Sequence, residues 1–397
     1  MKANKIHVLC NLDTQRDAYL QGVLDLVLNS IQNSASFRDA TFVLTGSMAR
    51  GEASVIQTEE GYESLSDMEF LVTHAQPINL SSIFKRLGEF EVGANERVRK
   101  AGFRCKIEFT YAVQRFFETV RPSIFSYELK EHGKVIHGLS NPLSLMRDFS
   151  ANNIPQIDAF YLLCNRILEQ LDGIRRYFVD DNFRDVIKFR YSILKLYVDL
   201  ATSILIFLGG YSSTYEGRRV AMLSMDWAKT NDVPNRKFLV DKVNHWTNVK
   251  LSPTYDTMQL MQHDAVIEEW VELARIALSI WLWELEQFMG RSGETLVQKC
   301  GKFGVLGETR VTLKAQVKYL LFALKRFELG VQAPFRFLYG NPRHNLYAES
   351  VIVYDFLASY FSLTRDSESN PNKVDLQANW RHIDGLVHVW TRYFRNA

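Results

Sequence analysis

Two neighbouring stretches decide the fold of this chain: Ala40-Thr41-Phe42-Val43-Leu44-Thr45-Gly46-Ser47 and Asp67-Met68-Glu69-Phe70-Leu71-Val72. The first predicts a strand over residues 40–45, and the second predicts a strand over residues 67–72. Because alternate side chains of a strand share one face, we expect Asp67 and Glu69 to lie side by side. Two adjacent carboxylates repel each other unless a positive charge lies between them. The pair therefore predicts a site for a divalent metal ion.

Gly46 and Ser47 stand where the first strand is expected to give way to a helix that continues to Glu52. The backbone N–H groups at the start of a helix are unpaired, and the positive end of the helix dipole lies there. An anion such as a triphosphate suits this point. A Gly-Ser pair alone is most often a plain turn, so the interpretation depends on the order and spacing of the nearby carboxylates.

A third carboxylate, Glu108, lies at the centre of a segment that alternates with a period of two. The side chains expected on one face are Phe103, Cys105, Ile107, Phe109 and Tyr111, and those expected on the other are Arg104, Lys106, Glu108 and Thr110. This pattern predicts a third strand over residues 103–113. Glu108 is then either a further metal ligand or the partner of Arg104 and Lys106 in ion pairs on a solvent-facing strand.

The rest of the chain changes character near residues 152–155. Before that point we expect helices over residues 14–33, 78–91 and 122–131 and an edge strand over residues 133–138. After it we expect helices over residues 157–177, 183–208, 264–287, 312–329, 351–363 and 379–394. Trp281, Trp283, Trp380 and Trp390 of these later helices are expected in the core. The fold class is α+β: a mixed sheet with flanking helices in residues 1–150, followed by an all-α domain in residues 151–397.

Composition narrows the range of possible partners and locations of the protein. The 397 residues carry a formal net charge of +2, so nucleic acid is a possible partner but is not indicated. Four cysteines lie far apart with no CxxC pair, which argues against a zinc site or a disulfide framework and favours the cytoplasm. No apolar stretch reaches the roughly 18 residues that a bilayer requires, so we expect no membrane span.

The motifs Leu44-Thr45-Gly46-Ser47-Met48-Ala49-Arg50-Gly51-Glu52 and Leu65-Ser66-Asp67-Met68-Glu69-Phe70-Leu71-Val72, with the later Glu108, resemble the polymerase-β-type nucleotidyltransferase superfamily, in its minimal and kanamycin-nucleotidyltransferase-like branch. The resemblance covers residues 40–140. It implies a nucleotidyltransferase sheet in the N-terminal domain and two Mg²⁺ ions held by Asp67, Glu69 and Glu108. Two features depart from the pattern: Glu69 replaces the usual Asp, and residues 53–64 are expected to form an inserted loop over the site.

The resemblance also implies a nucleotide site. Gly46, Ser47 and Arg50 would hold the phosphates, and Lys195 of the helical domain would supply a further cation. Arg50 has an alternative as a helix-surface charge paired with Glu52 or Glu59. Lys195 has one as the i, i+4 partner of Asp199. A weaker candidate is the pair Arg218-Arg219, for which a solvated loop is the more ordinary interpretation.

These features together predict a magnesium-dependent nucleotidyltransferase. It would transfer a nucleoside monophosphate from ATP or another nucleoside triphosphate to a hydroxyl acceptor and release pyrophosphate. The near-neutral charge favours a small-molecule acceptor, and an RNA end, a second nucleotide or a protein hydroxyl remain open. The alternatives are a second-messenger or RNA-modifying enzyme of a defence or toxin–antitoxin system, a catalytically silent nucleotide-binding module, and a nucleic-acid-binding adaptor.

Overall fold

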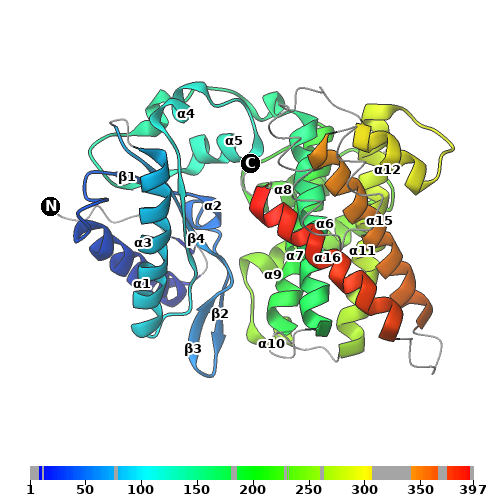
Figure 1. Ribbon diagram of the computed structural model, residues 1–397, viewed down its shortest axis with the longest axis horizontal. Helices are drawn as coiled ribbons and strands as arrows, with labels where there is room; N and C mark the ends of the chain where they lie inside the picture. Colours follow the sequence, from blue (N-terminus) through cyan, green and yellow to red (C-terminus); the bar gives the residue numbers. More distant parts are fainter. Residues whose placement is uncertain are drawn as a thin grey trace. The chain divides into compact units, whose positions relative to one another are not determined.

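The computed structural model describes residues 9–10, 13–75, 79–179, 186–227, 230, 232–259, 263–305, 341–364 and 373–393. They form two compact units. The N-terminal unit consists of residues 1–158, 208–224 and 244–258, and the helical unit contains the remainder. Figure 1 labels most of the elements of both units. The chain thus combines α and β structure in a small mixed sheet followed by a mainly helical region.

A four-stranded sheet forms the centre of the N-terminal unit. Its order is β5 (Ile107–Tyr111), β4 (Met68–Thr73), β1 (Thr41–Leu44) and β6 (Lys134–His137). β1 runs antiparallel to both β4 and β6, whereas β4 and β5 run parallel. The three expected strands and the expected edge strand are therefore present, each within a few residues of its predicted bounds.

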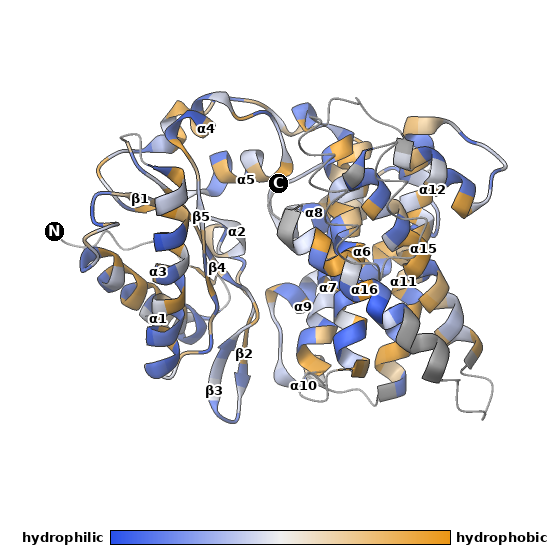
Figure 2. Ribbon diagram, viewed as in Figure 1, coloured by the Kyte–Doolittle hydropathy of each residue, from blue (hydrophilic) through white to orange (hydrophobic). Residues whose placement is uncertain are grey.

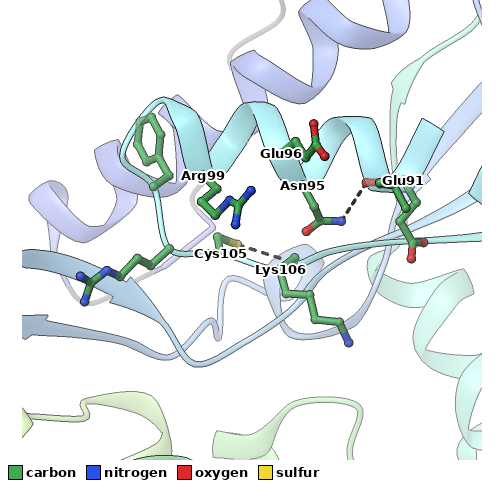
Figure 3. A pocket seen from close by; sticks show the side chains of 9 residues that line it. Glu91, Asn95, Glu96, Arg99, Cys105 and Lys106 are labelled. Carbon is green, nitrogen blue, oxygen red and sulfur yellow. Dashed lines mark hydrogen bonds between the residues drawn. The ribbon is translucent and has the colours of Figure 1, made fainter. Parts of the chain in front are cut away.

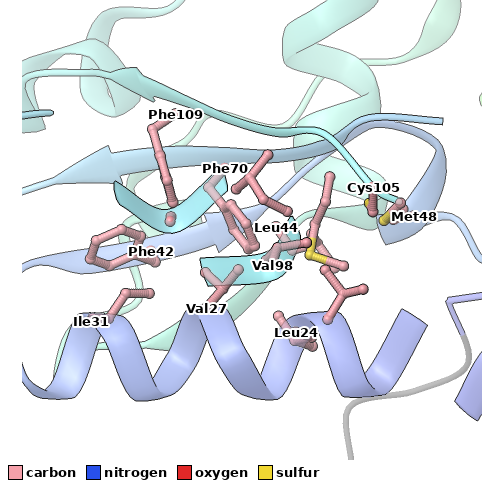
Figure 4. Packing of buried hydrophobic residues seen from close by; sticks show 14 of the residues in the cluster. Leu24, Val27, Ile31, Phe42, Leu44, Met48, Phe70, Val98, Cys105 and Phe109 are labelled. Atoms are coloured by element: carbon pink, nitrogen blue, oxygen red, sulfur yellow. The ribbon is translucent and has the colours of Figure 1, made fainter. Parts of the chain in front are cut away.

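Helices α1 (Thr14–Gln32) and α3 (Leu80–Lys100) contribute apolar side chains to the core on one face of the sheet. Both helices contain hydrophobic as well as hydrophilic residues, as expected for helices with one buried face (Figure 2). Phe42, Phe70 and Phe109 from three strands meet Val27 and other side chains of these helices in the core (Figure 4). A smaller cluster that involves α4 (Gln114–Thr119) and α5 (Ile124–His132) packs on the other face.

The segment expected to be an inserted loop over the site is instead a hairpin. It contains β2 (Val55–Thr58) and β3 (Gly61–Ser64), which pair antiparallel. The loop prediction was wrong because Val55 and Ile56 are fully buried, and burial of their side chains requires backbone whose polar groups are paired. That this segment covers a bound substrate stays a prediction.

The helical unit is built on long helices. Their bounds are α6 (Gln156–Val179), α7 (Val186–Phe207), α11 (His263–Met289), α12 (Leu296–Val305), α15 (Pro342–Thr364) and α16 (Lys373–Tyr393). α11 packs against α7 and α15, and α12 and α16 pack against α15. The four tryptophans expected in the core are buried, as predicted. The helix expected over residues 312–329 lies outside the described residues. Within the described ranges, no helix is both long and apolar enough to cross a bilayer.

The division of the chain differs from a single boundary at residue 150. Helix α8 (Tyr215–Ser224), the second half of α9 (Arg236–Leu251) and most of α10 (Tyr255–Gln259) belong to the N-terminal unit. Two short 3₁₀ helices, Pro142–Leu145 and Ala151–Asn153, precede α6. The later helices join the N-terminal unit through buried polar contacts, because Arg218 pairs with Glu128 and Lys250 contacts Ser54.

Candidate functional site

Three carboxylates converge at one end of β4 and β5. Asp67 precedes β4, Glu69 lies in β4, and Glu108 stands opposite Glu69 in the parallel register of β5. One oxygen from each side chain lies within 4.8 Å of the other two. All three side chains are partly exposed, so an ion from solvent can reach them. The prediction that these three residues meet is confirmed.

The alternation of each strand turns the three carboxylates away from the main core. Met68 and Phe70 of β4 are buried against α1 and α3, so Asp67 and Glu69 point to the opposite face. In β5, Ile107 and Phe109 are buried in the same way, which places Glu108 on the same face as the other two acids. The apolar residues therefore determine the position of the acidic ones.

Gly46 lies directly against this cluster. Its backbone has a φ of +68°, and a Cβ atom added there would lie 2.4 Å from the Glu69 carboxylate. The neighbouring Thr45 donates its backbone N–H to the Glu69 carbonyl at 2.9 Å, which fixes the turn against β4. Only glycine combines this backbone conformation with so close an approach.

The helix after Gly46 is shorter than expected. α2 (Gly46–Ala49) is a single turn, and the left-handed Gly51, with a φ of +75°, follows it. So short a helix has little dipole, so any phosphate held here depends on individual groups. The Ser47 side chain is partly exposed, and its hydroxyl makes no hydrogen bond to any described residue.

Lys106 places a positive charge beside Glu108. Its ammonium forms an ion pair with the Glu108 carboxylate, and its side chain is 55% exposed. This pair is one half of the alternative predicted for a solvent-facing strand. The other half was wrong, because Arg104 pairs with Glu60 and Glu63 instead of Glu108. The pair and a metal ion are competing ways to offset the same negative charge.

The free edge of β5 is covered by polar side chains of α3. Asn95 bonds both the N–H and the carbonyl of Ile107, and Glu91 accepts the N–H of Phe109 at 2.8 Å. A cavity of about 540 Å³ opens beside this edge between α3 and the segment that contains Cys105 (Figure 3). Burial raises the pKa of the Cys105 thiol to about 12, so it is no nucleophile at neutral pH.

Arg50 occupies a buried network of charges. Its side chain is 3% exposed, and it pairs with Glu52 at 3.0 Å and with Glu128 at 2.5 Å. Glu128 also pairs with Arg218 and accepts the Tyr211 hydroxyl at 2.6 Å. Burial alone would raise the pKa of Glu128, but the two guanidinium groups and the hydroxyl hold it below its ordinary value. The predicted Arg50–Glu52 pair is confirmed, but the expected helix-surface position was wrong, because Glu52 and Glu128 hold the guanidinium in a buried site. These contacts favour a structural role over phosphate binding.

The same network corrects the interpretation of Arg218-Arg219. Arg218 is a buried residue of α8, and Arg219 pairs with Glu216 at the surface of the same helix. The prediction of a solvated loop was wrong because Arg218 is buried in an ion pair with Glu128. The sequence does not reveal that these two residues are partners. Glu52 adds a contact that was not foreseen: its carboxylate accepts the backbone N–H of Tyr215 at 3.0 Å at the start of α8.

Lys195 lies in α7 of the helical unit. Its ammonium is 5.5 Å from the centroid of the Tyr191 ring. Asp199, the expected i, i+4 partner, forms an ion pair with Arg166 of α6. A contact between Lys195 and a nucleotide stays a prediction.

No protein-family model, curated protein or solved structure matches this chain. The resemblance to nucleotidyltransferases thus stays an expectation from the motifs. The geometry of Asp67, Glu69, Glu108 and Gly46 is the basis for assigning a function.

Proposed function

We propose that the N-terminal unit binds divalent cations and transfers a nucleoside monophosphate from ATP, or another nucleoside triphosphate, to a hydroxyl acceptor. The observation that carries the proposal is the convergence of Asp67, Glu69 and Glu108 within 4.8 Å. The position of Gly46 against Glu69 supports it, because the turn expected to hold the phosphates adjoins the carboxylates. The near-neutral net charge favours a small molecule as the acceptor.

The donor set fits magnesium. Mg²⁺ prefers oxygen ligands and is commonly held by a few carboxylates together with substrate phosphates. Asp67, Glu69 and Glu108 supply carboxylate oxygens alone, with partial exposure that leaves room for phosphate and water. We propose these three residues as the ligands of two Mg²⁺ ions. When bound, such ions lower the pKa of an attacking hydroxyl and offset charge on the triphosphate.

Individual residues of the chain would then have separate roles in the reaction. The acceptor oxygen attacks the α-phosphorus, the bond from that phosphorus to the pyrophosphate oxygen breaks, and Glu108 accepts the proton of the attacking hydroxyl. The Ser47 hydroxyl and the backbone at Gly46 would hold the leaving phosphates. Lys106 would release Glu108 when a cation of higher charge binds.

The test is nucleotide turnover by the full chain. We would incubate it with α-labelled ATP, Mg²⁺ and a panel of hydroxyl-bearing small molecules, nucleotides and RNA, and measure pyrophosphate release and transfer of the label. Asp67→Asn and Glu69→Gln should abolish both signals, whereas Asp148→Asn, which changes a carboxylate that is 96% exposed, should leave them unchanged. Turnover that persists in the first two variants, or that is absent from the wild-type chain with every acceptor, would overturn the proposal.

The second candidate function is a catalytically silent nucleotide-binding module. The observation that favours it is the Lys106–Glu108 ion pair, since it offsets the charge of Glu108 without a metal ion. Such a module would bind ATP with an affinity that does not depend on Mg²⁺. Isothermal titration with ATP in the presence and absence of Mg²⁺ separates the two functions.

A further inference from the structure

Lys250 lies at the end of α9, far along the sequence from the acidic cluster. Its side chain is 2% exposed, and its ammonium donates to the Ser54 hydroxyl at 2.7 Å and to the Ser66 hydroxyl at 3.3 Å. The Glu52 carbonyl lies 3.5 Å away, and the centroid of the Tyr215 ring lies at 5.1 Å. A buried ammonium costs several kcal/mol unless polar groups surround it. These oxygens and the ring therefore hold Lys250 in one position.

The contacts of Lys250 brace both ends of the β2–β3 hairpin. The Ser54 backbone N–H donates to the Ser66 hydroxyl at 2.9 Å, and the Leu65 N–H donates to the Ser54 carbonyl at 2.9 Å. Ser54 also donates its own hydroxyl to the Lys250 carbonyl at 2.7 Å. Ser66 is thus fixed by two donors, one from the main chain and one from Lys250.

Ser66 immediately precedes Asp67. On the other side of Asp67, the Met68 N–H donates to the Lys106 carbonyl at 2.8 Å. The backbone of Asp67 is therefore held on both flanks, by the Lys250–Ser66 contact and by the pairing of β4 with the start of β5. Its carboxylate can meet the other two acids only if this backbone keeps its place.

We infer that Lys250 is a positioning residue for the metal site, acting through Ser66 on Asp67. This inference rests on the proposed function, because it assigns Lys250 to the same three-carboxylate site. Removal of a group that orients a metal ligand without touching the metal commonly lowers metal affinity by about 10- to 100-fold. An apolar residue at the position of Lys250 would fill the same space but could not orient Ser66. The orientation of Ser66 is therefore a reason for a buried ammonium at this position.

The test measures metal binding directly. We would titrate the full chain with Mn²⁺ and follow free Mn²⁺ by electron paramagnetic resonance, at a temperature well below the unfolding midpoint of each variant. Lys250→Met should weaken Mn²⁺ binding by about 10- to 100-fold, and Ser66→Ala should weaken it less but in the same direction. Lys130→Met is the matched control: Lys130 donates to the Met146 carbonyl at 2.9 Å in the same unit, and this change should leave Mn²⁺ affinity unaltered.

The outcomes separate this inference from the proposed function. If Asp67→Asn loses Mn²⁺ while folded Lys250→Met and Ser66→Ala bind it like the wild type, the positioning role is overturned and the metal site stands. If Asp67→Asn binds Mn²⁺ like the wild type, the metal site and the role of Lys250 fall together. Should circular dichroism show that Lys250→Met is unfolded, Ser66→Ala decides: weakened binding supports the role, and unchanged binding overturns it.

Discussion

Replacement of Gly46 by alanine should disable the acidic cluster while the fold persists. The added Cβ would lie 2.4 Å from the Glu69 carboxylate, whereas ordinary contact between heavy atoms begins at about 3.5 Å, so the carboxylate must move by about 1 Å. The φ of +68° adds strain of about 1 to 2 kcal/mol for an alanine. A displacement of about 1 Å in a catalytic group can lower activity by about 100-fold. We expect a loss of that size in turnover, together with weaker Mn²⁺ binding.

Gly209→Ala is the matched control for this prediction. Gly209 has a φ of +75° in the same unit, and a Cβ there would meet nothing within 4 Å. Both variants should therefore lose similar stability in guanidinium unfolding, and only Gly46→Ala should lose Mn²⁺ affinity and turnover. Equal Mn²⁺ affinity in the two variants would refute the argument that Gly46 keeps space for a metal-binding Glu69.

Three further predictions concern buried or paired charges. Glu128→Gln should lower the free energy of unfolding by about 3 kcal/mol at neutral pH, because it removes the buried carboxylate that offsets the charge of both Arg50 and Arg218. Because the folded-state pKa of Glu128 is lowered, the difference in the free energy of unfolding between this variant and the wild type should be largest above pH 4.5 and decrease below it. Urea unfolding at several pH values would measure this. Burial raises the pKa of Glu284 to about 8, so the wild type should lose about 3 kcal/mol of stability as the pH rises from about 5 to 8, and Glu284→Gln should remove that dependence in the same titration. Lys106→Met should tighten Mn²⁺ binding, because it removes the ammonium that competes for Glu108; unchanged or weaker binding would show that the two cations do not share that carboxylate.

The sequence was sufficient to predict the four strands of the main sheet and the face on which the acidic residues lie. Each strand around Asp67 and Glu108 combines a period-two pattern with buried apolar neighbours, and this local pattern fixes which face a side chain occupies. The parallel pairing that sets Glu69 opposite Glu108 joins two strands separated by α3, so its direction and register could not be predicted from the two strands alone. The face of each acidic side chain could be predicted because it depends on residues close together in the chain.

The buried charges could not be predicted in the same way. Glu128 lies 78 residues from Arg50 and 90 from Arg218, and Lys250 lies 184 residues from Ser66. A charged residue in a helix looks the same in the sequence whether it faces solvent or a distant partner. These contacts also explain why α8 and the second half of α9 belong to the N-terminal unit although they follow the long helices α6 and α7 in the chain.

Crystals of the full chain soaked with Mn²⁺ would test the central claim most directly. Anomalous diffraction at the manganese edge should show density between Asp67, Glu69 and Glu108, with the Lys106 ammonium displaced from Glu108. The absence of such density at saturating Mn²⁺, with the Lys106–Glu108 pair still in place, would contradict the claim that these carboxylates form a metal site.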